Sequence, residues 1–179
     1  MSPARHLWRV VAALFAALAA NQASAYNLTE SSISAMPLGK IVADSTVSVF
    51  NVNASSGLVT KISGTAIRLT SGSVTTPTIT IKCASSGTNC NRTFTVQILA
   101  GSTLSGRPTT ITSFNVANLS GGAGVTFSPS APPAAAPMTF SIVSTVTTFT
   151  VTFKVGLKAR FNASATTGNT DWTYTVSVS

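Results

Sequence analysis

The sequence is poor in the side chains that most enzymes use for catalysis. Its 179 residues include three acids, one histidine and two cysteines. The acids are Glu30, Asp44 and Asp171, which are widely separated along the chain. General acid–base and nucleophilic chemistry depend mainly on His, Asp, Glu, Lys and Cys, and glycoside hydrolysis needs two well-placed carboxylates. The composition therefore indicates a protein that is not an enzyme, with no catalytic residues.

Long apolar runs are also scarce. The longest begins at Val10 and ends at Ala20; it follows Arg5 and Arg9 and precedes small residues that end at Ala25. This order of basic, apolar and small residues is typical of a secretory signal peptide. The run is shorter than the roughly 20 residues of a membrane-spanning helix. We expect cleavage after Ala25, with a retained N-terminal anchor as the alternative.

Two ranges follow for the domain organisation: a signal peptide at 1–25 and a single mature domain at 26–179. The mature protein is expected in the periplasm, at the cell surface or outside the cell, with no transmembrane segment after cleavage. Its only histidine, His6, belongs to the signal peptide. A zinc site needs about four ligands from Cys, His, Asp and Glu. We therefore predict no metal-binding or cofactor-binding residues and no cofactor.

Cys83 and Cys90 are the only cysteines, and they lie in the segment IKCASSGTNCNRTF. Metal ligands, a redox pair, free thiols and a disulfide are the alternatives. The spacing is not CxxC, the usual redox arrangement, and exported thiols tend to pair. Cys83 shares a strand face with Ile79 and Ile81, and Cys90 shares one with Phe94, because a strand alternates faces. The two cysteines are predicted to form a disulfide at the end of a hairpin.

Most of the remaining sequence alternates apolar and polar residues with period two, which is the pattern of a half-buried strand. Thr and Val, which favour strands, are frequent in these segments. The clearest segments are 45–52, 65–70, 138–145, 149–161 and 171–178; further candidates are 58–63, 109–119 and 124–128.

Nine or ten short strands with turn-rich connections predict an all-β fold, an antiparallel β-sandwich of Ig-like or pilin-like type. The proline-rich segment SPSAPPAAAP (128–137) is expected to form an extended loop that crosses between sheets, since proline cannot donate to a strand ladder. The final strand should bury Trp172, Tyr174, Val176 and Val178.

Basic residues outnumber acids throughout the mature chain. Without Arg5 and Arg9, the 11 basic residues fall to nine against three acids, a net charge of +6. We interpret this charge as solvated charge that protects sheet edges, with attraction of an anionic polysaccharide as the alternative. Runs of adjacent basic residues and stacking aromatics are absent from the sequence, so nucleic acid is not an expected partner.

Three stretches resemble the bacterial domain of unknown function (DUF) family 4402: MPLGKIVADSTVSVFNV (36–52), GTAIRL, and the pair TPTITI and TFTVQI. Family members close on the pattern Gly-x-Tyr-x-Gly-x-Phe-x-Val-x-Val. The segment GNTDWTYTVSV (168–178) keeps Gly168, Tyr174, Val176 and Val178 in step. It departs from the pattern at Thr170 and Trp172. Leu38 likewise stands where the family usually has Phe.

The resemblance implies an exported β-sandwich of the cell envelope, similar in style to spore-coat-protein-U-like proteins and archaic chaperone–usher pilin subunits. Those relatives polymerise by adding a strand to an open sheet edge. The expected function is a non-enzymatic surface protein, a structural or adhesive fimbrial-like subunit. Its expected partners are further copies or envelope proteins bound by strand addition. The alternative is a soluble secreted module that binds carbohydrate or another ligand. The N-terminal segment 26–36 is either a donor strand or an integral first strand, and its polar character favours the integral strand.

Overall fold

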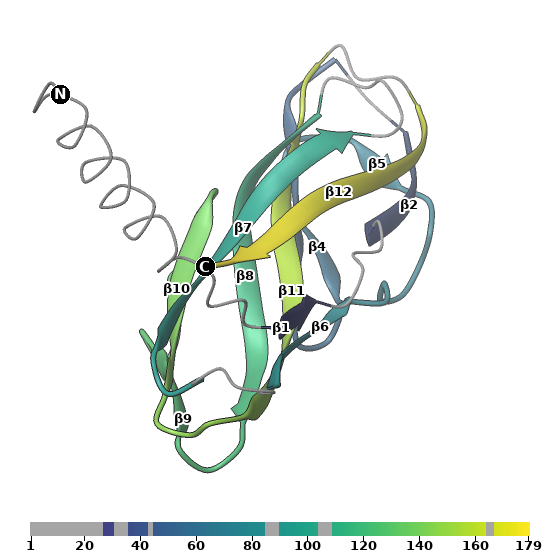
Figure 1. Ribbon diagram of the computed structural model, residues 1–179. Helices are drawn as coiled ribbons and strands as arrows, with labels where there is room; N and C mark the ends of the chain where they lie inside the picture. The colour runs from purple at the N-terminus through teal and green to yellow at the C-terminus, as the bar shows by residue number, and fades with distance from the viewer. Residues whose placement is uncertain (1–26, 31–35, 43–44, 85–89, 104–108, 164–166) are drawn as a thin grey trace, which may run out of the picture.

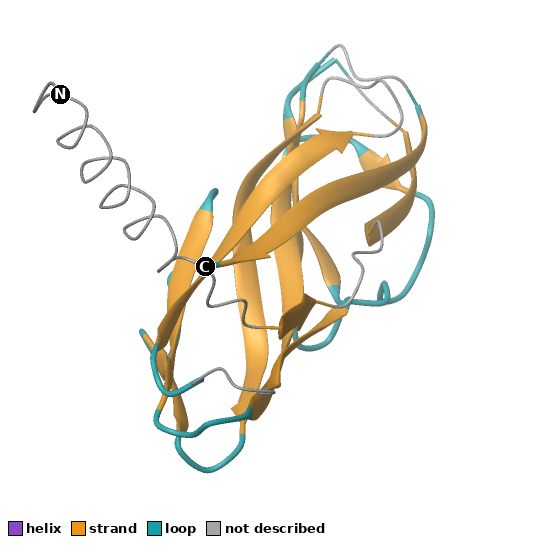
Figure 2. Ribbon diagram, in the orientation of Figure 1, coloured by secondary structure: helices purple, strands orange, loops and turns teal. Residues whose placement is uncertain are grey.

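The computed structural model describes residues 27–30, 36–42, 45–84, 90–103, 109–163 and 167–179 (Figure 1). The predicted signal peptide at 1–25 lies outside these ranges. The described residues contain strands and connecting segments and no helix (Figure 2). The strands are β1 (Asn27–Glu30), β2 (Met36–Val42), β3 (Ser48–Val52), β4 (Val59–Ser63), β5 (Ile67–Arg68), β6 (Thr78–Ala84), β7 (Thr93–Thr103), β8 (Thr109–Gly121), β9 (Val125–Ser128), β10 (Met138–Ser144), β11 (Phe149–Phe161) and β12 (Gly168–Val178).

These strands form two antiparallel sheets, which confirms the predicted all-β sandwich. The first sheet has the order β1-β6-β11-β3-β4, with β8 also paired to β11. The second has the order β5-β2-β12-β7-β10-β9. Chain neighbours such as β6 and β7 therefore lie in different sheets, so the sandwich is held together largely by contacts between distant parts of the sequence.

Strand β11 organises the first sheet. Its residues 151–161 pair with β8, while the opposite edge is shared by β6 at 149–154 and β3 at 157–161. The predicted alternation is confirmed: every second side chain from Phe149 to Leu157 is buried. Pairing along both edges satisfies the backbone groups of β11, and its apolar face packs against the core.

The change from β3 to β6 along β11 takes place at Gly156, which is buried. A Cβ at this glycine would collide with the backbone of Val52 and would lie 2.6 Å from Oδ1 of Asn115. The Asn115 side chain uses this space: its amide donates to Val52 O at 3.1 Å and its oxygen accepts from Ala54 N at 2.9 Å. One side chain therefore satisfies backbone groups where β3 leaves the sheet.

Strand β12 has the corresponding place in the second sheet, because its first half pairs with β2 and its second half with β7. Trp172, Tyr174 and Val176 are buried as predicted, and Val178 is half-buried. Trp172 packs edge-on against Phe161 of the opposite sheet and donates to Thr109 Oγ1 at 3.4 Å. The C-terminal strand is thus a central element of the core.

The sequence-based prediction was wrong at segments 36–42 and 128–137. The segment MPLGKIV was not predicted as a strand, yet it forms β2 with Met36, Leu38 and Ile41 buried; proline and glycine interrupt its alternation. The proline-rich loop 128–137 does not cross between sheets, because it joins the paired strands β9 and β10. The crossing instead occurs at 121–125, between β8 and β9. The loop contacts the first sheet through a backbone bridge from Ala135 to Phe114.

Candidate functional site

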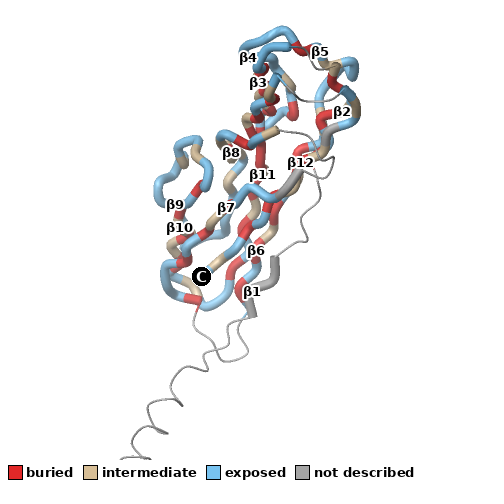
Figure 3. The backbone as a smooth tube through the Cα atoms, turned by 90° about the horizontal axis from the view of Figure 1, so that it is seen from above, coloured by how far each residue is buried: buried red, intermediate tan, exposed pale blue. Residues whose placement is uncertain are grey.

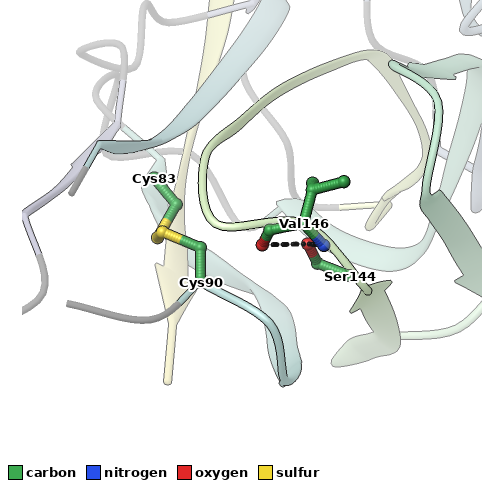
Figure 4. The surroundings of a disulfide bond; sticks show 4 residues. All are labelled: Cys83, Cys90, Ser144 and Val146. Carbon is green, nitrogen blue, oxygen red and sulfur yellow. Dashed lines mark hydrogen bonds between the residues drawn. A yellow bond between two sulfur atoms is a disulfide. The ribbon is translucent and has the colours of Figure 1, made fainter.

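The predicted pair Cys83–Cys90 forms a disulfide, with Cα atoms 6.1 Å apart (Figure 4). Both residues are buried, at 1% and 0% exposure. The prediction that this disulfide closes the end of a hairpin was wrong. Cys83 lies near the end of β6 in the first sheet, and Cys90 precedes β7 of the second, so the bond joins the two sheets across the core. The alternation pattern correctly placed both cysteines on inward faces and so predicted the bond. It does not show whether the two strands are neighbours in one sheet or face each other across the core.

The surroundings of the disulfide are packed and hydrogen-bonded. Ser144 is buried, its hydroxyl bonds to the backbone of Val146, and its N–H donates to Arg92 O at 3.1 Å (Figure 4). The Arg92 guanidinium lies 5.3 Å from the centre of the Phe94 ring, a cation–π contact. A disulfide shielded in this way is suited to a structural role, since thiol exchange requires access to the sulfur atoms.

The two acidic residues that the structure describes lie on different strands. Glu30 lies on β1 in the first sheet and Asp171 on β12 in the second, while Asp44 lies outside the described residues. Within the described ranges, the structure contains no group of three His, Cys, Asp or Glu side chains that could hold a metal ion.

Six of the basic residues fall into two groups. Lys82, Lys154, Lys158 and Arg160 are spread along β6 and β11 in the first sheet. Lys61 and Arg68 lie instead at one end of the sandwich, on β4 and β5, where both line a hollow of about 360 Å³. This volume is at the lower end of the roughly 300–1,000 Å³ of small-molecule sites. The hollow was not predicted from the sequence.

A single closed segment builds this hollow. Residues 57–74 leave β3, form β4 and β5, and return so that Val74 N donates to Gly57 O at 2.9 Å. The backbone of residues 57–74 thus forms a closed loop, the 57–74 ring. Gly57 has φ +69°, and a Cβ there would collide with Val74 O, so glycine is required for the closure. Apart from Phe50 of β3, every described residue that lines the hollow belongs to the ring.

The ring is fastened to both sheets. Ala66 N donates to the buried Ser48 hydroxyl at 3.0 Å in the first sheet. On the side of the second sheet, Leu69 N donates to Lys40 O at 2.9 Å, and Lys40 N donates to Thr70 Oγ1 at 3.2 Å. The ring is therefore a preorganised part of the fold.

Arg68 is the best-positioned cation of the hollow. Its Nε donates to Leu38 O at 2.7 Å and its Nη1 donates to Gly72 O at 2.8 Å. Partial burial lowers the pKa of its guanidinium from the ordinary value, but an arginine remains charged at neutral pH. The described lining contains no acidic side chain. The two carbonyls therefore orient a cation that leaves further N–H donors for an anion.

Sequence reasoning missed this site because it assigned 58–63 and 65–70 as ordinary half-buried strands. Four of their aliphatic side chains are instead exposed: Leu58 by 50%, Ile62 by 58%, Ile67 by 58% and Leu69 by 55%. The three glycines at 57, 64 and 72 were the sequence signal for a looped segment. In the structure all three have positive φ.

The phenol of Tyr174 is the unusual polar group of the core. Its hydroxyl is buried without a hydrogen-bond partner in the structure, and its ring packs edge-on against Phe114 at 5.9 Å. Burial raises the pKa of this phenol well above its ordinary value. Because the hydroxyl is buried without a hydrogen bond, it represents an energetic cost to the fold.

In the part of the chain that the structure describes, no helix has the length and apolar character to cross a membrane. No family model matches the chain, and the comparisons with curated proteins and with solved structures return no significant match.

Proposed function

We propose that the protein is an exported, non-enzymatic component of the cell envelope that serves as a structural or adhesive subunit. The buried disulfide between the two sheets is the observation that carries this proposal. Disulfides form and persist in oxidising compartments such as the periplasm and the cell surface. The basic, apolar and small residues of 1–25 support the same destination.

The subunit role is supported by the sheet edges and by the resemblance to DUF family 4402. Strand β1 pairs only with β6 and β9 only with β10, so each has one edge without a partner strand among the described residues. An unpaired edge can accept a strand from another chain. Further copies of this protein, or envelope proteins, are the partners that this mode of assembly requires.

The non-enzymatic character is supported by the scarcity of acid–base side chains. The sequence has three acids, and its only histidine, His6, lies in the predicted signal peptide. Replacing Glu30, Asp44 and Asp171 together by their amides should leave the biological activity of the protein close to that of the parent. An activity that collapsed when one of these acids was lost would identify an enzyme.

Export is tested by fractionating the source cells and alkylating thiols before and after reduction. The protein should be found beyond the inner membrane, start near residue 26, and react with the alkylating reagent only when unfolded and reduced. Recovery of an intact N-terminus and two reactive thiols in the cytoplasm would overturn the proposal.

Assembly is tested by truncating residues 26–35 and following both thermal unfolding and polymer formation. An integral first strand is needed for both, so the truncated protein should melt earlier as well as assemble less. A truncated protein that melts normally but no longer assembles would identify the segment as a donor strand. A full-length protein that remains monomeric in the envelope would exclude the subunit role.

The hollow in the 57–74 ring favours a second candidate function, a soluble secreted module that binds carbohydrate or another ligand. Lys61 and Arg68 suit an anionic ligand such as an acidic polysaccharide. The two functions differ in polymer state: a subunit should form ladders on non-denaturing gels, whereas a binding module should remain monomeric and retain its ligand through purification.

A further inference from the structure

Exposed aliphatic side chains are concentrated at one end of the molecule. Six large hydrophobic side chains are exposed among the described residues, and all except Leu99 lie between Val47 and Leu69. Figure 3 shows this end at the top of the view, with exposed segments around β4 and β5. Single exposed aliphatic residues are common, but a group of them on one segment marks an interaction surface.

Four of the exposed side chains, Leu58, Ile62, Ile67 and Leu69, lie on the 57–74 ring, which also carries the cations Lys61 and Arg68. Leu58 and Ile67 line the hollow together with Lys61 and Arg68. Arg68 is oriented by the carbonyls of Leu38 and Gly72, as described above. Apolar side chains interspersed with oriented cations are complementary to a surface in which an apolar layer lies beneath a layer of anionic groups.

We propose that the 57–74 ring docks onto an anionic lipid surface. Leu58, Ile62, Ile67 and Leu69 enter the boundary between headgroups and acyl chains, while Lys61 and Arg68 bind lipid phosphates. Interfacial binding of this kind combines buried apolar area with attraction to anionic lipids. The inference does not depend on the proposed subunit role, because it rests only on the surface of the ring.

Charge favours a lipid surface over a second copy of the chain. A symmetric contact through the ring would bury the rings of both copies against each other, and each ring carries Lys61 and Arg68. The described lining of the hollow offers no carboxylate to compensate them. Like charges in a desolvated contact are unfavourable, whereas lipid phosphates supply the missing negative charge.

The test is co-sedimentation of the purified protein with vesicles of phosphatidylcholine alone and with vesicles containing equal parts of phosphatidylglycerol. Binding should require the anionic lipid and should weaken as the salt concentration rises, because the charges lie near the surface. Strong binding to phosphatidylcholine alone, or no binding to either vesicle at low salt, would overturn the proposal.

Two pairs of variants localise the contact. Ile67→Ser with Leu69→Ser should lower the vesicle partition coefficient at least tenfold, whereas Leu99→Ser changes an exposed aliphatic residue on β7 and should leave it within about twofold. Lys61→Gln should lower it by roughly fivefold, whereas Lys82→Gln, on β6, should have a smaller effect. Equal losses from ring and control variants would contradict docking through the ring.

A fold control and an alternative partner complete the design. Circular dichroism and thermal melting should show the ring variants to be folded, since the substituted side chains are exposed. Sedimentation velocity without lipid should show that the ring variants do not change the oligomeric state. If they instead dissociated an oligomer while vesicle binding persisted, the ring would be a contact between copies and the lipid proposal would be wrong.

Discussion

The body of the sandwich and the 57–74 ring are built from similar sequence patterns, yet they treat their apolar side chains oppositely. Strands β11 and β12 bury Phe153, Leu157 and Trp172 completely, while Ile62 and Leu69 in the ring are more than half exposed. The difference lies in whether another sheet packs against the apolar side chains. Each central strand faces the other sheet, whereas the ring lies where both sheets end at β4 and β5. A period-two pattern therefore predicts a strand, but the apolar face of that strand is buried only where the opposite sheet packs against it.

The largest expected effect on the free energy of unfolding comes from removing one buried side chain of the sandwich, and it is compared with removing one exposed side chain of the ring. Trp172→Ala removes a completely buried indole from between the sheets and should lower the free energy of unfolding by about 3–5 kcal/mol. Leu69→Ala, in the ring, should change it by less than about 0.5 kcal/mol. Urea unfolding of both variants measures the contrast, and comparable losses would mean that the ring belongs to the cooperative core.

Removing the disulfide should have the next largest effect on the body of the sandwich. The double variant Cys83→Ser, Cys90→Ser frees the short loop in the unfolded chain and should be destabilised by about 2.5 kcal/mol. Unfolding is measured with and without reductant. Reductant should lower the stability of the parent toward that of the variant and leave the variant unchanged. A parent insensitive to reductant under unfolding conditions would show that the bond does not contribute.

Asn115→Ala tests the junction at which β3 leaves β11. Losing the side chain leaves Val52 O and Ala54 N without their partners, which should cost about 2 kcal/mol. Thr110→Ala on the same strand is the matched control, since Thr110 is exposed and should tolerate the change within about 0.5 kcal/mol. Hydrogen exchange should also show faster exchange at Ala54. Unchanged exchange there would mean that water replaces the amide.

The smallest expected effect concerns Tyr174. Tyr174→Phe removes a buried hydroxyl that has no partner, so the variant should be as stable as the parent or more stable by roughly 1 kcal/mol at neutral pH. A less stable variant would reveal a partner for the hydroxyl.

The same substitution has a signature in alkali. Since burial raises the pKa of Tyr174 in the folded state, the unfolded chain releases its phenolic proton at lower pH than the folded protein does. The parent should therefore lose stability as the pH rises above about 10, the ordinary pKa of tyrosine. Tyr174→Phe should lose less over the same range, and denaturation curves at pH 8 and above measure the difference. Parallel losses in both proteins would contradict the assignment.

Much of the fold could be predicted because period-two alternation is a local property. The strand at 149–161 was predicted with the bounds of β11, and the inward parity of Cys83 and Cys90 led to the correct disulfide. Strand β2 was missed because Pro37 and Gly39 disturb its pattern; Gly39 has φ +82°, a conformation rare for other residues.

The sequence by itself determined the strand character, the apolar face of each strand and the pairing of the cysteines, because side-chain chemistry and alternation are set locally. Only the tertiary structure decided that β6 and β7 lie in opposite sheets, that β12 is central, and that the aliphatic residues of the 57–74 ring remain exposed. These features depend on which distant strand lies opposite, and hydrogen bonds such as Val74 N to Gly57 O join positions that no local pattern relates.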